Sequence, residues 1–208
     1  MTITFEEIKQ MEGRKRAQFI NALSGIKSAN LIGTKSEKSQ ENLTIVSSVI
    51  HLGSNPALLG FIQRPTSVER HSFENLKSTG FYTINAVGEG FVSQAHQTSA
   101  RYPREKSEFD ATGLQSIYKG GFYAPFVVES SLQIGMKLEQ IVPLEINDTK
   151  LIIGSIQVVH SNIEIQEDGF FDISKSDIVG ITGLDNYVKT DKISRFSYAK
   201  PFKQLKVL

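Results

Sequence analysis

The stretch VVESSLQIGMKLEQIV, from Val127 to Val142, decides the fold. Apolar and polar residues alternate around Leu132–Leu138, which is typical of a β-strand with one buried face. The turn sequence Ile146-Asn-Asp-Thr149 follows, and a second β-prone run extends from Leu151 to Ile165. The sequence therefore predicts a long antiparallel hairpin, large enough to curl across a small barrel.

Shorter β-prone runs and four helices are predicted around this hairpin. The runs are separated by polar, Gly, Asn or Pro breaks, and they cover Ala29–Thr34, Leu43–Ile50, Ala57–Ile62, Phe81–Val87 and Ile193–Tyr198. The helices comprise a segment opened by the capping box Thr4–Glu7, then Lys15–Leu23, Phe73–Thr79 and Phe91–Gln97. The fold class that follows is α+β, mainly β: a small barrel with N-terminal and crossover helices.

The overall composition limits the function classes that need to be considered. The 208 residues contain no repeat or linker, so residues 1–208 are expected to form one domain, with residues 1–25 as a helical N-terminal extension. A net charge of +1 gives no reason to expect nucleic acid or membrane as a partner, and the lack of Cys excludes disulfides and thiolate chemistry. Since no signal peptide or membrane span is apparent, a soluble cytoplasmic protein is predicted.

Two polar blocks indicate a site for a phosphate group. Asn42–Ser48 is a strand-like run with three hydroxyls, and Glu69–Leu76 places Arg70, His71 and Ser72 where a helix is predicted to begin. Hydroxyls, backbone N–H groups at a helix N-terminus and a guanidinium together suit a phosphate. A simpler interpretation stays open, in which the hydroxyls cover a solvated edge strand and Ser72 is an ordinary N-cap.

No other region offers a specific catalytic motif. The four His residues, at positions 51, 71, 96 and 160, lack the spacing of metal ligands, and His160 in its β-run fits a hydrogen-bonded, half-buried residue. Glu129 or Asp185 could act as a general base, although neither has a partner that the sequence identifies. The sequence contains no nucleophile elbow and no dinucleotide fingerprint. A bound phosphorylated cofactor would therefore have to supply the chemistry.

With these blocks in place, the chain resembles the flavin reductase-like family of FMN-binding split barrels, from about Ser24 to Pro201. The matching blocks, in the family's order, are Asn42–Ser48, His51–Leu59, Arg70–Leu76, Phe81–Asn85, Ser107–Leu114, Glu129–Ser131, Gly154–His160 and Gly183–Tyr187. The chain departs from the family pattern at several positions. His71 and Ser72 replace the usual Asp and Thr, Ile45 stands where Pro is common, and Leu184 replaces one Gly of a pair.

The resemblance implies FMN bound at the interface of a homodimer, with NAD(P)H as the electron donor for hydride transfer to flavin N5. The implied cofactor-binding residues are Asn42, Thr44, Ile45, Ser47, Ser48, Arg70, His71, Ser72, His160 and Tyr187. The isoalloxazine would accept hydrogen bonds from the main-chain N–H groups of Thr44 and Ile45. The phosphate would be held by Ser47, Ser48, Arg70 and Ser72. The nicotinamide side would be lined by His160 or Tyr187. No catalytic side chain and no metal are expected.

Two other functions remain open at this point. One is a flavin-binding electron carrier, sensor or storage protein without NAD(P)H turnover, because the contacts to FMN would be the same. The other is a protein-interaction barrel whose site has decayed, against which the retention of Arg70, Ser72 and the Asn42–Ser48 block argues.

Overall fold

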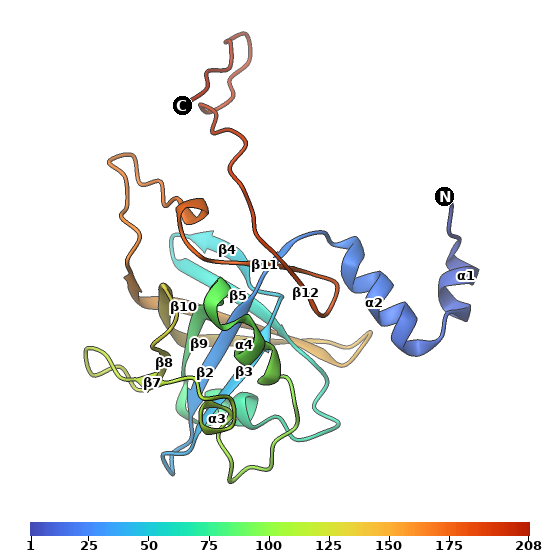
Figure 1. Ribbon diagram of the computed structural model, residues 1–208, viewed down its shortest axis with the longest axis vertical. Coiled ribbons are helices and arrows are strands. Elements are labelled where there is room, and N and C mark those ends of the chain that lie inside the picture. The colour runs from blue at the N-terminus through green and yellow to red at the C-terminus, as the bar shows by residue number, and fades with distance from the viewer.

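The computed structural model describes residues 1–208, and its largest element is a seven-stranded antiparallel sheet (Figure 1). In spatial order its strands are β3 (Glu41–Val46), β2 (Asn30–Lys35), β6 (Phe81–Ala86), β9 (Leu132–Leu144), β10 (Thr149–Ser161), β5 (Ala57–Gln63) and β4 (Ile50–Ser54). The predicted long hairpin is confirmed, since β9 and β10 pair from Leu144 opposite Thr149 to Leu132 opposite Ser161. This hairpin joins the two parts of the sheet, because β9 also pairs with β6 and β10 with β5.

The start of β9 differs from the prediction, which placed Val127 in the long strand. Val127 belongs to a short strand β8 (Phe126–Val127), paired with β7 (Ser116–Ile117). The chain then turns at Ser130, whose N–H donates to the Val127 carbonyl and whose hydroxyl lies 2.8 Å from the carbonyl oxygens of Ala86 and Leu132. This turn separates β8 from β9, and the sequence showed only a continuous β-prone run.

Two irregularities in the β9–β10 pairing bend the sheet, one between Ile153 and Gly154 and one between Ile156 and Val158. β-Bulges increase the local twist of a strand and help a sheet to close on itself. As a result, the turn after β3 approaches β5: the Ser48 hydroxyl accepts a hydrogen bond from the Ile62 N–H at 3.0 Å. The first strand of the sheet thus meets the sixth. The predicted run Leu43–Ile50 is accordingly divided between β3 and β4.

Two apolar clusters lie on opposite faces of the curled sheet, as the alternation of strand residues requires. On β2, Ile32 packs inside the barrel with Tyr82 and Met136, and this cluster includes Phe73 of the helix α3 (His71–Thr79). Leu31 belongs to the second cluster, whose members from outside the large sheet include Phe91, Ala95, Phe109, Val179 and Ile181. β2 is therefore buried on both faces and fixes the position of its neighbour β3.

The predicted helices are present, with shifted ends. They are α1 (Phe5–Gln10), α2 (Gly13–Leu23), α3, and α4 (Val92–Gln97), which follows a 3₁₀ turn η1 (Glu89–Phe91). The capping box is confirmed, because the Thr4 N–H donates to the Glu7 carboxylate at 2.7 Å and the Thr4 hydroxyl accepts from the Glu7 N–H. The prediction that Ser72 is the N-cap of α3 is wrong: Arg70 holds that position, and Ser72 lies in the first turn. The short helix α5 (Glu108–Thr112) was not predicted.

The C-terminal region contains a small sheet that the sequence did not predict. It consists of β1 (Lys27–Ser28), β11 (Gly180–Thr182) and β12 (Asn186–Val188), and a 3₁₀ turn η2 (Ile173–Lys175) precedes it. The predicted last strand Ile193–Tyr198 is wrong, because this segment makes only an isolated bridge from Phe196 to Val207. In Figure 1, helices α1 and α2 and the segment after β12 extend away from the body. No helix is long and apolar enough to cross a membrane.

The bend at Gly154 leads to a prediction about stability. A Cβ atom at this position would overlap the Tyr82 hydroxyl and lie 2.9 Å from the Lys137 carbonyl oxygen. We expect Gly154→Ala to lower the free energy of unfolding by about 1–3 kcal/mol, as overpacking of a core does, measured by urea denaturation. Gly13→Ala is the control, since a Cβ there meets no atom within 4 Å. An equal loss in both variants would contradict this explanation.

Candidate functional site

A cavity of about 910 Å³ opens beside the edge strand β3. Its wall is formed by the C-terminal half of β3 and the turn after it, the end of β5, the loop before α3 with the first turn of that helix, α4 with the loop after it, α2, and the β11–β12 hairpin. Segments far apart in the sequence thus meet in one place. This volume lies in the upper part of the range found for cofactor and small-molecule sites.

Eight of the ten residues that the sequence predicts as cofactor contacts line this cavity. They are Thr44, Ile45, Ser47, Ser48, Arg70, His71, Ser72 and Tyr187. The fold therefore brings the hydroxyl block, the start of α3 and the late Gly183–Tyr187 block together. Asn42 and His160 do not line the cavity.

Asn42 belongs to a buried hydrogen-bond network behind the cavity wall. Its amide oxygen accepts from Asn75 of α3 at 2.9 Å, and its Nδ2 donates to the Glu108 carboxylate of α5 at 3.3 Å. The same Glu108 oxygen accepts the N–H of Leu43 at 2.9 Å. Asn42 thus ties β3 to two helices and positions the strand, while its own side chain is buried.

His160 lies near the end of β10, opposite Gln133 of β9, and outside the cavity. Its ring packs edge-on against Phe126 with 5.2 Å between ring centroids, and its Nε2 is buried without a hydrogen-bond partner. No residue of β10 lines the cavity. The structure therefore does not bring His160 to the site where the prediction places it.

The free edge of β3 presents backbone donors to the cavity in alternation. The Leu43 N–H points away from β2, because Glu108 accepts it. Residues two apart in a strand point the same way, so the Ile45 N–H also faces away from β2 and toward the cavity. By the same alternation the Thr44 N–H faces β2, which corrects its predicted role as a main-chain donor.

The hydroxyl groups of the cavity differ in their availability. The Ser48 hydroxyl is engaged by the Ile62 N–H at 3.0 Å and holds the barrel closed, as described above. The hydroxyls of Thr44, Ser47 and Ser72 make no hydrogen bond within the protein. They remain free to bind a ligand.

Arginines dominate the charge of the cavity. Those that line it are Arg14, Arg64, Arg70, Arg101 and Arg104. Only Arg104 has a carboxylate partner, Glu74. Burial, together with the positive charges of Arg64 and Arg101, lowers the pKa of Arg70 from its usual value. Three guanidinium groups without counter-charges therefore lie near one another beside the first turn of α3. Such a region favours a ligand with a multiply charged anionic group.

The first turn of α3 adds His71 to this region. Its Nε2 lies 3.4 Å from the carboxylate of Glu69, which is largely exposed. The imidazole of His71 stands where the resemblance led us to expect an Asp, so this position brings no carboxylate to the neighbourhood of Arg70. The departure noted in the sequence is thus compatible with the anionic ligand that the arginines favour.

The opposite wall depends on a clamp between α2 and the β11–β12 turn. Nε2 of Gln18 lies 2.8 Å from both carboxylate oxygens of Asp185, and Oε1 of Gln18 accepts the N–H of Leu184 at 3.1 Å. Gly183 begins this turn with φ of +62°, a conformation that glycine adopts without strain. Gln18 therefore holds Asp185 in place. The other candidate base, Glu129, lies outside the cavity, where it accepts a hydrogen bond from the Gln115 N–H.

His96 and Tyr187 form a hydrogen-bonded pair in the cavity, with 3.0 Å between Nδ1 of His96 and the tyrosine hydroxyl. Burial, and then the negative charge of Asp185, raise the pKa of Tyr187 to about 12. The phenol therefore stays protonated at physiological pH. Sequence reasoning missed His96, Gln18 and Arg101, because each lies in a segment without a recognisable motif.

Comparison with known proteins identifies the class of this molecule. A family model described as a flavin reductase like domain matches residues 25–173. The chain belongs to this flavin reductase-like family, whose solved members share the split-barrel fold, and its function is accordingly flavin-related. The matched range excludes α2 and the β11–β12 hairpin, so one wall of the cavity is formed outside it.

Among the solved structures, the chain is similar to a split-barrel protein from Shewanella frigidimarina NCIMB 400 that is provisionally named a flavin reductase. The identity is 52%, the TM-score is 0.92, and 96% of this chain and 100% of that chain are covered. Nitrilotriacetate monooxygenase component B from Bacillus cereus shares the fold, with 18% identity, a TM-score of 0.79, and 92% and 96% coverage. So does the flavoredoxin of Desulfovibrio vulgaris (Miyazaki F), with 21% identity, a TM-score of 0.67, and 86% and 92% coverage. No curated protein matches the chain.

The Glu108 contacts behind the cavity wall lead to a second prediction about stability. Glu108→Ala removes the acceptor of the buried Leu43 N–H and of the Asn42 amide. We expect the free energy of unfolding to fall by about 1–3 kcal/mol, the usual cost of leaving buried donors unpaired. Asp110→Ala on the same helix is the control, since Asp110 is exposed. The explanation fails if the two variants unfold at the same urea concentration.

Proposed function

We propose that this protein is an FMN-binding flavoprotein that acts as an NAD(P)H-dependent flavin reductase. The observation that carries the proposal is the group of Arg64, Arg70 and Arg101, which lack carboxylate partners and lie in one cavity with the free Ile45 N–H of β3. Membership of the flavin reductase-like family supports a flavin as the ligand. We further propose that residues 1–208 form a single domain and that two copies form a homodimer. The cytoplasmic location remains a prediction from the sequence.

The residues of the cavity fit FMN in particular. Its phosphate carries close to two negative charges, which suits Arg70 with Arg64 and Arg101 and the unengaged hydroxyls of Ser47 and Ser72. The Ile45 N–H and the Thr44 hydroxyl would contact the polar edge of the isoalloxazine. Acceptance of a hydride at N5 from NAD(P)H is the chemistry that bound FMN supplies.

The wall formed by α2 and the β11–β12 hairpin would accommodate the nicotinamide. Tyr187 is the residue of this wall that we propose to contact the nicotinamide. Because Tyr187 remains protonated and its hydroxyl is held by His96, it would present a fixed polar group to this ligand. The names of the structural relatives are consistent with this assignment. One is named a monooxygenase component and another a flavoredoxin.

A non-turnover flavoprotein, serving as an electron carrier, sensor or storage protein, is the second candidate. It is favoured by the fold shared with an FMN-binding protein from Thermus thermophilus, at 15% identity and a TM-score of 0.66. An anaerobic titration with NADH and then NADPH, followed by the visible absorption spectrum of the FMN-loaded protein, separates the two. Bleaching of the flavin bands supports the reductase. A spectrum that stays unchanged with both nucleotides favours the carrier and excludes the reductase.

Arg70 provides a direct test of cofactor binding. Arg70→Ala removes one charge-assisted contact to the phosphate, worth about 1.5–3 kcal/mol. We expect the dissociation constant for FMN to rise roughly tenfold to a hundredfold, measured by quenching of flavin fluorescence. Arg16→Ala is the matched control, because Arg16 is exposed on α2 outside the cavity. An unchanged constant in Arg70→Ala would remove this residue from the site.

Gln18 tests the opposite wall. Gln18→Ala releases both Asp185 and the Leu184 N–H, so the β11–β12 turn loses its clamp. We expect the KM for NAD(P)H to rise severalfold, while the dissociation constant for FMN stays within about twofold, because the FMN contacts lie on the β3 and α3 side. Stopped-flow and steady-state oxidation of the nucleotide measure the first quantity. A parallel loss of FMN affinity would show that the two walls do not act separately.

A further inference from the structure

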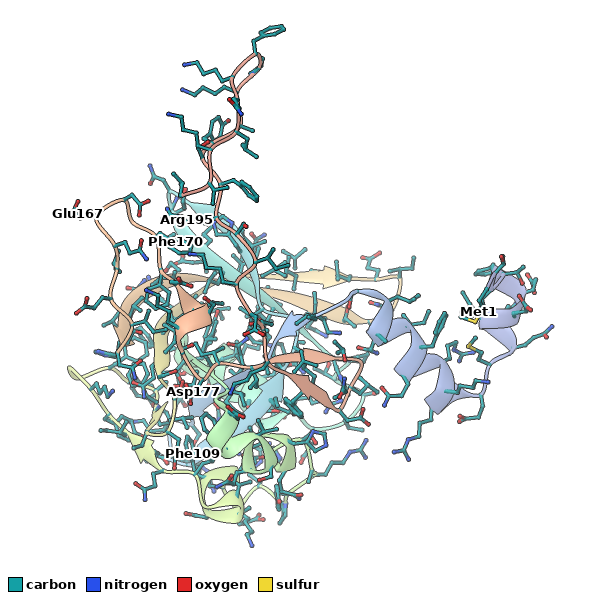
Figure 2. The ribbon with its side chains drawn as sticks, turned by 45° about the horizontal axis from the view of Figure 1, so that its top comes forward. Met1, Phe109, Glu167, Phe170, Asp177 and Arg195 are labelled. Carbon is teal, nitrogen blue, oxygen red and sulfur yellow. The ribbon has the colours of Figure 1, made fainter.

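The last twenty residues, 189–208, form a segment that we call the C-terminal arm. It leaves the body after β12 and extends away from it, with Arg195 near its base (Figure 2). The base is attached, since Arg195 pairs with Asp168 and its guanidinium lies 3.9 Å from the ring centroid of Phe170. Lys192 lies 3.8 Å from Asp172 on the same side. The arm is therefore oriented by its base rather than hanging loosely from the body.

The outer part of the arm bonds only to itself. The Ser197 N–H donates to the Lys206 carbonyl at 2.9 Å, and the Leu208 N–H donates to the Arg195 carbonyl at 2.8 Å. These contacts fold the arm back as a narrow hairpin without a core beneath it. An isolated two-stranded hairpin is marginally stable in water. A surface that covers it would stabilise it.

The side chains of this hairpin are unusually apolar for an exposed segment. Tyr198 is 87% exposed and Phe202 fully exposed, and the exposed large apolar residues of the arm further include Ile193, Phe196, Leu205, Val207 and Leu208. Single exposed apolar residues are normal on a protein surface, but a contiguous group marks an interaction site. The arm thus has the composition of an interface.

The charge of the arm indicates what it contacts. It contains five Lys and one Arg against one Asp, a net charge of +5. Since the whole chain carries +1, residues 1–188 carry −4. Lys189, Lys192 and Arg195 at the base already pair with carboxylates of the arm's own body. The outer part keeps three unpaired cations, Lys200, Lys203 and Lys206, which are opposite in sign to the net charge of the body. Complementary charges guide association and select the partner.

At least part of the arm is aligned with a solved relative. The alignment with the Shewanella frigidimarina protein leaves out 4% of this chain, which is fewer residues than the arm contains, and it covers all of that chain. The body, for its part, exposes Ile50 and Leu52 on β4, an edge strand of the large sheet. An unpaired edge with apolar side chains accepts further chain readily.

We propose that the C-terminal arm lies on the body of a second copy of this chain, so that two arms are exchanged in a symmetric dimer. Each arm places its apolar hairpin on the acidic body of the partner, and the same patch serves both copies, as a two-fold interface requires. This assignment names the element that would hold the homodimer together. It does not depend on flavin binding, so its failure is distinguishable from a failure of the proposed function.

Point variants in the full-length chain test the arm. Tyr198→Ser with Phe202→Ser removes two side chains that are almost fully exposed, so the monomer is expected to fold unchanged. We expect the dimer dissociation constant to rise by about tenfold or more, as for loss of buried aromatic anchors, measured by sedimentation equilibrium. Ile146→Ser is the matched control, since Ile146 is 97% exposed at the β9–β10 turn. A monomeric wild type, or an equal effect of the control, would overturn the proposal.

Cross-linking shows which copy the arm contacts, and the chain suits this experiment because it has no Cys. Ala199→Cys introduces one thiol into the arm for a photoactivated benzophenone label. After mixing of ¹⁴N and ¹⁵N chains, we expect arm–body peptides that combine one light and one heavy member. Exclusively light–light and heavy–heavy peptides would place the arm on its own body and overturn the proposal.

A basic, apolar arm can also bind anionic membranes or nucleic acids, and both are tested directly. Vesicles of phosphatidylglycerol and phosphatidylcholine, and a double-stranded DNA fragment, are mixed with the wild type and the arm variant. We expect no difference in binding between the two proteins. Vesicle or DNA binding that the variant loses, with an unchanged association state, would overturn the second copy as the occupant.

Discussion

The pairing of β9 with β10 is the interaction on which the rest of the molecule depends. In the order of paired strands, these two strands join the β3–β2–β6 part of the sheet to the β5–β4 part. Where their register shifts, at Gly154 and again before Val158, the sheet bends enough for Ser48 to reach Ile62. A flat sheet would keep the turn after β3 far from β5, and the cavity would not form. The position of the arginines around this turn is thus a consequence of two irregularities in a hairpin.

The cavity separates its charges in a way that suits an anionic ligand. Glu108 is buried beside the arginines, but its carboxylate is used by the Leu43 N–H and the Asn42 amide of the strand behind. Arg64, Arg70 and Arg101 have no such partner and face the cavity. The carboxylate of Glu108 thus holds β3 in position, while the three guanidinium groups stay available to a ligand. Preorganised positive groups of this kind cost little reorganisation when an anion arrives.

The sequence could predict the elements that depend on neighbouring residues, but not those that depend on contacts between distant segments. The β9–β10 hairpin was predictable because alternation is a local property of consecutive residues. α5, β11 and β12 were not, since segments of three to five residues have no periodicity to detect and are stabilised by contacts with distant elements. The strand predicted at Ile193–Tyr198 has suitable residues but no partner strand within the chain.

The candidate site follows the same rule. The two polar blocks, Asn42–Ser48 and Glu69–Leu76, could be recognised from their residue types, and the fold brings them together at one cavity. His160 is not at the cavity because β10 contributes no residue to its wall, which depends on how distant strands pair and is not visible in the sequence. Arg101 and Gln18 were missed because their importance arises only from what lies opposite them.

The clamp formed by Gln18 has a consequence for how such a protein can change over evolutionary time. The wall built on β3 and α3 is part of the barrel, so substitutions there also affect strand pairing and the apolar clusters. The wall built on α2 lies outside the matched family range and is held to the hairpin by the hydrogen bonds of one side chain. Residues of α2 can therefore diverge with little effect on the barrel. The shape of one cavity wall can thus change through substitutions in the N-terminal helix alone.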